Sequence, residues 1–195
     1  MNPQIWWYVS RSSGIVAWVL VSLSVCWGLF VSTKAVAKAS SPAWLLDFHR
    51  YVGGLSVIFT AIHMIGLAAD NYVTFGWAET FVPMASEWKP GAVAFGIVGF
   101  YFLVAIEVTS LAMKRLPRRL WRWIHRCSFP LYFVATYHGI LAGTDHENQW
   151  FRLAALASIN VVLFLTLVLI LAARRAAVTP LRSARELGRP SRELA

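Results

Sequence analysis

The hydrophobic positions of this chain form long runs that are separated by short polar connections. A segment needs about 20 mainly apolar residues to cross a bilayer, and five runs reach that length: residues 14–32, 43–69, 91–113, 121–143 and 151–173. The pattern predicts an all-α membrane protein, a five-helix transmembrane bundle, that occupies residues 1–173. Residues 174–195 are rich in arginine and lack apolar periodicity, so we expect a basic cytoplasmic tail that is disordered or bound to the membrane surface.

The distribution of positive charge predicts how the bundle is oriented. Five spans place alternate connections on opposite sides, and fifteen of the 18 Lys and Arg residues then fall on one side. The remaining three are Arg11, Lys89 and Arg152. Under the positive-inside rule, the N-terminus lies outside and the C-terminus is cytoplasmic. We therefore expect an integral multi-pass protein of a bacterial-type cytoplasmic (inner) membrane.

The composition excludes an ordinary soluble domain. Hydrophobic residues make up 58% of the chain and charged residues 14%, and the mean hydropathy is +0.58. The net charge of +9 comes from residues beside the apolar runs, as membrane topology requires, so we predict membrane lipid and no nucleic acid as a partner. The two cysteines, Cys26 and Cys127, fall in or beside spans and indicate no disulfide framework.

Four of the five histidines lie inside predicted spans: His49 and His63 in the second, and His125 and His138 in the fourth. An ionisable side chain in a spanning segment indicates a functional site. The second and fourth spans run in the same direction, so their histidines match by depth: His49 with His125, and His63 with His138. The rise is about 21 Å between the first two histidines and about 19.5 Å between the second two.

Paired imidazoles on facing helices are how a helical bundle holds haem iron. The pattern therefore predicts two b-type haems, one near each face of the membrane. All four histidines would be metal ligands. Tetrahedral zinc is disfavoured because it requires four ligands at one point, whereas these histidines form two layers.

The rotation per residue along a helix places His49 and His63 on one face of their span, but it does not place His125 and His138 on one face of theirs. At 100° per residue, His63 returns to within about 40° of His49, but His138 lies about 140° from alignment with His125 in an undistorted helix. Pro130 lies between the last two, and an internal proline bends or rewinds a helix. We expect Pro130 to correct the alignment.

Small residues flank the histidines. Gly53 follows His49 by four residues, Gly66 follows His63 by three, and Ala135 and Ala142 flank His138. These gaps either leave room for a porphyrin or allow close helix packing.

Three charged residues are further candidates. Arg50 directly follows His49, and Arg126 directly follows His125. Both arginines are predicted to bind the propionates of the haem nearer the cytoplasm, or else they belong to the basic residues that gather on the cytoplasmic side. Glu107 in the third span is either a buried partner for one of these arginines or a proton-handling group.

The two histidine segments, HRYVGGLSVIFTAIH and WRWIHRCSFPLYFVATYH, resemble those of the ferric reductase-like transmembrane domain family. This family includes the membrane cores of ferric reductases and NADPH oxidases and the haem-binding membrane subunit of methionine sulfoxide reductase systems. The resemblance covers about residues 6–151. It implies two haems held by the histidine pairs named above, and electron movement across the membrane.

Two features depart from the family pattern. Members that act alone carry a C-terminal flavin and nicotinamide domain, and residues 174–195 are too few to form one. Many relatives have six spans, whereas five are predicted here. The resemblance therefore implies an oxidoreductase component that needs a partner, which supplies any flavin or quinone.

The first functional hypothesis is a b-type cytochrome subunit that moves electrons from a cytoplasmic flavoprotein or a membrane quinol to an acceptor outside. An exposed basic cluster would bind the acidic donor: Lys114, Arg115, Arg118 and Arg119. The alternatives are a haem-free structural or assembly subunit, and a histidine-based metal or proton transporter.

Overall fold

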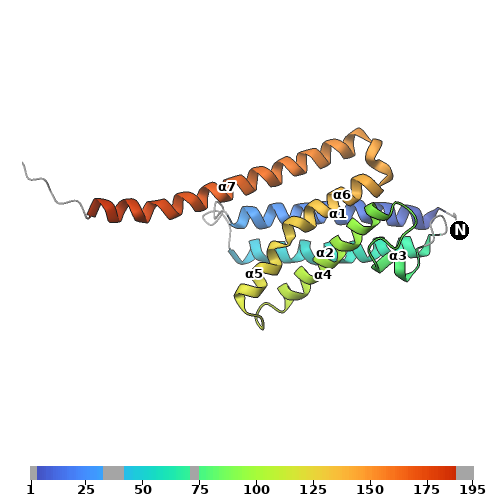
Figure 1. The fold of residues 1–195 in the computed structure, drawn as a ribbon, viewed down its shortest axis with the longest axis horizontal. Coiled ribbons are helices and arrows are strands. Elements are labelled where there is room, and N and C mark those ends of the chain that lie inside the picture. Colours follow the sequence, from blue (N-terminus) through green and yellow to red (C-terminus); the bar gives the residue numbers. More distant parts are fainter. Residues whose placement is uncertain (1–3, 33–41, 71–74, 188–195) are drawn as a thin grey trace, which may run out of the picture.

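The computed structural model describes residues 4–32, 42–70 and 75–187. Within these ranges the chain forms seven α-helices and one short 3₁₀-helix, and no strand (Figure 1). The elements are α1 (Ile5–Ser32), α2 (Pro42–Ala69), α3 (Trp77–Phe81), α4 (Pro90–Leu111), α5 (Arg118–Arg126), α6 (Ser128–Ala142), η1 (Thr144–Glu147) and α7 (Gln149–Leu187).

Four of these helices are long and apolar enough to cross a membrane: Ile5–Ser32, Ala43–Ala69, Pro90–Leu111 and Gln149–Arg175. The prediction of an all-helical integral membrane protein is therefore confirmed. The prediction of five continuous spans is wrong at the fourth, which the structure divides into α5, with 9 residues, and α6, with 15 residues. The predicted orientation of the bundle stays a prediction.

The break between α5 and α6 has a local cause. Pro130 has no N–H and cannot donate the helical hydrogen bond to the carbonyl of Arg126, four residues earlier. At the break, the N–H of Cys127 bonds to the carbonyl of Ile124, three residues earlier, at 2.9 Å. The regular four-residue bonding resumes where the N–H of Leu131 bonds to the carbonyl of Cys127. Pro130 thus lies in the first turn of α6, where a proline is tolerated.

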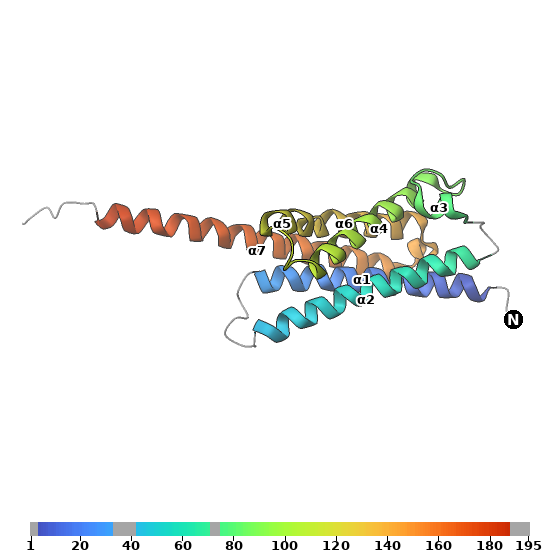
Figure 2. The same ribbon diagram turned by 90° about the horizontal axis from the view of Figure 1, so that it is seen from below.

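The helices pack as an up-and-down bundle. α1 and α2 lie side by side and antiparallel, and α4 packs against α6 (Figures 1 and 2). The buried core joins four helices through Val25 of α1, Leu103 of α4, Tyr132 of α6 and Val162 of α7. The Tyr132 side chain is fully buried and its hydroxyl hydrogen-bonds to that of Ser158 on α7, at 2.8 Å. This core fixes α6, and with it His138, relative to α1 and α4.

The last helix is longer than the sequence predicts. α7 continues through Leu187 and extends beyond the other helices (Figure 1), whereas a tail that is disordered or bound to the membrane surface was expected from residue 174. Residues 188–195 of that tail lie outside the described residues. The division into a membrane domain and a tail at residue 173 stays a prediction.

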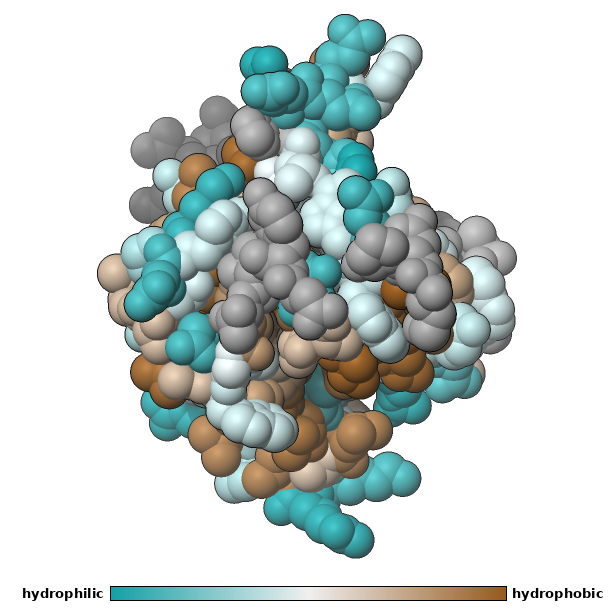
Figure 3. All heavy atoms as spheres, turned by 90° about the vertical axis from the view of Figure 1, so that its right-hand side faces the viewer, coloured by the Kyte–Doolittle hydropathy of each residue, from teal (hydrophilic) through white to brown (hydrophobic). Residues whose placement is uncertain are grey.

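The opposite end of the molecule gathers the start of α1, helix α3 and η1 (Figure 1). Viewed from that end, hydrophilic and hydrophobic side chains are mixed on the surface (Figure 3). Such mixing is typical of residues at a membrane boundary.

Candidate functional site

The structure brings the four intramembrane histidines together as two pairs. The ring centroids of His49 and His125 lie 6.0 Å apart with an angle of 78° between the ring planes. Those of His63 and His138 lie 6.2 Å apart at 77°. We call them the inner pair and the outer pair, after their predicted sides of the membrane. The break after α5 allows His125 and His138 both to face α2.

These separations fit two ligands of one metal ion. Two imidazoles that each lie about 2.0–2.1 Å from a shared metal have ligand nitrogens about 4 Å apart and ring centroids about 6 Å apart. Within the described residues, no group of three or more His, Cys, Asp or Glu side chains forms a metal site. Each pair would offer two imidazole nitrogens to a haem iron.

Hydrogen bonds select the ligand nitrogen in the outer pair. His63 Nδ1 lies 2.8 Å from the carbonyl oxygen of Ser10 on α1, to which it can donate its proton. His138 Nδ1 lies 2.8 Å from the carbonyl oxygen of Ala92 on α4. A metal-bound histidine usually donates its other ring N–H to such an acceptor, which fixes the tautomer and the ring orientation. Both Nε2 atoms are thereby left for a metal.

The inner pair has weaker neighbours at the same nitrogen. His49 Nδ1 lies 3.3 Å from the hydroxyl of Ser24 on α1, and His125 Nδ1 lies 3.4 Å from that of Ser110 on α4. These distances are at the long end for a hydrogen bond. The Trp121 ring stacks on His125 with centroids 5.1 Å apart, so packing contributes to holding this imidazole.

Glycines on α1 and α4 make space for the rings. A Cβ atom on Gly14 would lie 2.8 Å from His63 Nδ1, and one on Gly96 would lie 2.7 Å from His138 Cε1. A Cβ atom on Gly28 would lie 3.3 Å from His49 Cε1. Real Cβ atoms almost never approach within 3.0 Å, so the outer pair depends on its two glycines.

Two glycines singled out in the sequence have a different role. A Cβ atom on Gly66 would meet the backbone of Ser10 at 2.8 Å, and one on Gly53 would meet Glu107 Oε1 at 2.5 Å. Both therefore serve close helix packing, which was the alternative interpretation. Ala135 and Ala142 do line the cavity beside His138.

Helix α1 contributes contacts that sequence reasoning missed, because the predicted span at residues 14–32 contains no histidine and no charged residue. Ser10 and Gly14 contact His63, and Ser24 and Gly28 contact His49. The signal is present in the sequence: the Ser-x-x-x-Gly pattern recurs after 14 residues, the same step that separates His49 from His63. Since α1 and α2 are antiparallel, equal steps keep each Ser and Gly beside a histidine.

A cavity of about 310 Å³ lies at the outer pair. His63 and His138 line it together with small and apolar side chains from α1, α4 and α6. Its volume is at the lower end of the range for ligand sites of roughly 300–1,000 Å³. The two imidazoles, the space left beside them by Gly14 and Gly96 (the glycine cradle) and the cavity together fit a flat cofactor that is held by two histidines.

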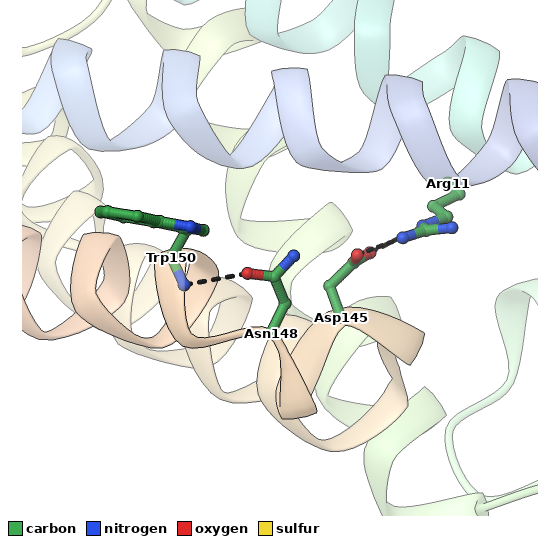
Figure 4. A network of polar contacts seen from close by, with 4 residues as sticks. All are labelled: Arg11, Asp145, Asn148 and Trp150. Atoms are coloured by element: carbon green, nitrogen blue, oxygen red, sulfur yellow. Dashed lines mark hydrogen bonds and ion pairs between the residues drawn. The ribbon is translucent and has the colours of Figure 1, made fainter.

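An ion pair between α1 and η1 lines the same cavity. Arg11 of α1 makes two contacts with the carboxylate of Asp145 on η1, one of them from Nε to Oδ2 at 2.8 Å (Figure 4). Next along the chain, the Trp150 N–H donates to Asn148 Oδ1 at 2.9 Å and caps the start of α7. The Arg11 guanidinium holds the pKa of Asp145 below its usual value. The sequence predicted no contact between these two residues.

The two predicted propionate ligands are exposed and contact residues of their own helices. Arg50 is exposed and lies 3.4 Å from Asp47 on its own helix. Arg126 is exposed and lies over the Trp123 ring at 5.5 Å. Glu107 lies against Gly53 of α2 and forms no ion pair with an arginine in the described part of the chain. A role for Arg50 or Arg126 in cofactor binding stays a prediction.

Comparison with known proteins gives one family and several relatives. A family model described as "Ferric reductase like transmembrane component" matches residues 13–136. The chain is 25% identical over 144 residues to the magnetosome protein MamZ of Magnetospirillum gryphiswaldense and 23% identical to MamZ of Paramagnetospirillum magneticum, and each match covers 72% of this chain and 20% of the relative.

A third relative is the protein-methionine-sulfoxide reductase heme-binding subunit MsrQ of Herminiimonas arsenicoxydans. It is 25% identical over 140 residues, which cover 69% of this chain and 56% of MsrQ. The chain thus spans about a fifth of the MamZ proteins and just over half of MsrQ. No solved structure matches the chain significantly.

Proposed function

The chain belongs to the ferric reductase-like transmembrane component family, and on that premise we propose that it is a membrane electron-transfer subunit with two bis-histidine b-type haems. Electrons would pass from a cytoplasmic flavoprotein or a membrane quinol to an acceptor on the outer side. The chain would be one component of an oxidoreductase and would need a partner for activity.

The observation that carries this proposal is the repeated geometry of the two pairs. Each pair joins α2 to the α5–α6 segment with ring centroids about 6 Å apart, at 6.0 and 6.2 Å. In each pair, Nδ1 has a neighbour on α1 or α4 that can accept its proton. Interhelical packing alone would not require the same arrangement twice.

When bound, each haem would supply one-electron redox chemistry at its iron. The residues of this chain would do the rest. The four imidazoles would bind through Nε2, while Ser10 and Ala92 would orient two of them through their carbonyl groups. Gly14 and Gly96 would leave room for the rings, and apolar side chains of the core would keep the medium between the layers dry.

Arg11 is the described basic residue best placed to balance the charge of a propionate at the outer pair. It lines the cavity with His63 and His138, and its guanidinium can bind a carboxylate with two parallel bonds, as it binds Asp145. The exposed cluster of Lys114, Arg115, Arg118 and Arg119 connects α4 to α5 at the opposite end. This cluster would bind an acidic donor beside the inner pair.

The direct test is a reduced-minus-oxidised absorption spectrum of the protein purified from cells that are supplied with haem. We expect b-type bands and two haems per chain. A colourless preparation from such cells would exclude the proposal and favour a haem-free subunit. His146→Ala, a change in η1 beyond the predicted spans, is the matched control and should keep both haems.

A further inference from the structure

Helix α7 is the least covered of the long helices. It lies at the edge of the bundle (Figure 1) and packs mainly against α1 and η1. Ala155 and Val162, exposed by 2% and 1%, mark the side that packs inward. Away from that side, the large apolar side chains of α7 are exposed, among them Leu153 and Leu163.

That exposed side carries a heptad pattern. Its a positions are Leu153, Asn160 and Leu167, and its d positions are Leu156, Leu163 and Ile170. We call these six residues the seam of α7. Its five apolar residues are exposed by between 46% and 56%, and Asn160 is exposed as well. The middle of the seam lies about 120° around the helix from Ala155 and Val162. Helix α7 therefore has two faces suited to helix packing, and only one of them is used.

Asn160 is the one polar residue of the seam. It lies about 16 Å along the helix from Gln149, near the middle of a hydrocarbon core about 30 Å thick. One of its N–H groups donates to the carbonyl of Leu156 at 2.8 Å. Among the described residues, its carbonyl oxygen and second N–H have no further hydrogen-bond partner. An amide in lipid is unfavourable unless another helix satisfies it.

We propose that this seam of α7 binds the same seam of a second copy of the chain, with the two Asn160 side chains hydrogen-bonded to each other. Copies inserted in one membrane have the same orientation, so their α7 helices must be parallel. A two-fold axis then brings Asn160 opposite Asn160. An amide both donates and accepts, so it complements its own copy. A single Asn at an a position is the device that fixes register and two-strandedness in parallel coiled coils.

The proposed dimer does not depend on haem. None of the seam residues lines the cavity at the outer pair. Haem binding and association of the two copies can therefore fail separately. Lipid alone or a helix of another protein could also cover the seam, and the experiment must distinguish these outcomes.

Disulfide cross-linking in native membranes tests the register of the proposed contact. In a background with Cys26→Ala and Cys127→Ser, single cysteines are placed at Leu156, Leu163 and Leu167 of the seam. Matched controls are placed at Ala154, Val161 and Val168, one helical step to the side. We expect covalent dimers of this chain from the first set and several-fold less from the second. Equal yields in both sets, no dimers, or adducts only with another protein would overturn the proposal.

Removal of the amide tests the role of Asn160. Interhelical hydrogen bonds in membranes have measured strengths that correspond to roughly 3- to 20-fold in association. Asn160→Ala in the otherwise unchanged protein should weaken dimerisation by that factor, measured by energy transfer between labelled copies in vesicles, while Asn160→Gln should retain most of it. Unchanged association of Asn160→Ala, or no energy transfer between unmodified copies, would contradict the pairing.

Discussion

The two histidine pairs are supported by different kinds of neighbours. At the outer pair, both Nδ1 atoms lie 2.8 Å from backbone carbonyls, and Gly14 and Gly96 fit closely against the rings. At the inner pair, the neighbours are serine hydroxyls at 3.3 and 3.4 Å, and a tryptophan stacks on one ring. Backbone carbonyls are thus the nearest partners at the outer pair, where the Ser10 hydroxyl also lies 3.2 Å from His63 Nδ1, whereas side chains are the partners at the inner pair.

This difference indicates how each site responds to substitution. A backbone carbonyl cannot be removed by changing its own side chain, so the outer pair is sensitive mainly to added volume. A serine hydroxyl can be removed without a steric clash, so the inner pair is sensitive to loss of a donor or acceptor. We therefore expect the outer pair to be held rigidly, and the contacts of the inner pair to be adjustable by substitution of its serines.

The largest effect is expected from filling the glycine cradle of the outer pair. Gly96→Leu places a side chain where His138 Cε1 lies only 2.7 Å from the first added atom. We expect the outer haem to be lost, which lowers the haem content from two per chain to one in a pyridine haemochrome assay. Gly28→Leu, where the first added atom lies 3.3 Å from His49 Cε1, is the matched change at the inner pair and should keep the outer haem. Retention of two haems by Gly96→Leu would refute the steric account.

The next largest effect is expected at the basic cluster beside the inner pair. Reversal of Lys114, Arg115, Arg118 and Arg119 to Glu should slow reduction by an acidic donor about tenfold or more at low salt, because opposite charges steer association. Stopped-flow absorbance measures this rate. The haem content should not change, and Arg152→Glu on the opposite side is the control. Identical reduction rates would discard the docking role.

A smaller effect is expected from the serines of the inner pair. Support of a metal-bound histidine by its second nitrogen is worth about 10- to 100-fold in metal affinity when the contact is well formed. The contacts of Ser24 and Ser110 are longer than usual, so Ser24→Ala and Ser110→Ala should each lower inner-haem affinity by less than tenfold. Haem titration of the apoprotein checks this, and a change confined to the outer haem would contradict it.

The smallest effect concerns the ion pair at the outer end. The lowered pKa of Asp145 means that the pair stabilises the folded protein above the ordinary carboxyl pKa of about 3.9. This stabilisation is lost as the pH falls through the lower folded value. Arg11→Gln should therefore cost about 1 kcal/mol at pH 7 and almost nothing near pH 2. Thermal unfolding at both pH values measures the difference; an equal loss at both would rule out the ionic origin.

The sequence predicted much of the helical architecture because apolar runs of membrane length leave few alternatives. It also predicted which histidines meet, since depth and topology determine the pairs. The rotational mismatch of His125 and His138 was identified, and Pro130 as its correction. The division of the fourth span into two helices was not, because a proline favours either a kink or a break and tertiary packing decides between them.

The neighbours of the histidines were harder to predict. Ser10 and Ala92 contact the histidines through their backbone carbonyls. Every residue type has a backbone carbonyl, so the sequence does not indicate which residue makes such a contact. Arg11 and Asp145 lie 134 residues apart in the chain, so only the folded bundle brings them together. The 14-residue repeat of Ser and Gly in α1 was readable, but it becomes informative only when α1 is known to lie antiparallel to α2.

The central claim is that two separate pairs each hold one haem. Haem content and spectra of the four single His→Ala variants test this most directly. We expect His63→Ala and His138→Ala to lose the same haem and to keep the other, and His49→Ala and His125→Ala to show the reverse. Loss of both haems from every variant, or of neither, would contradict the account.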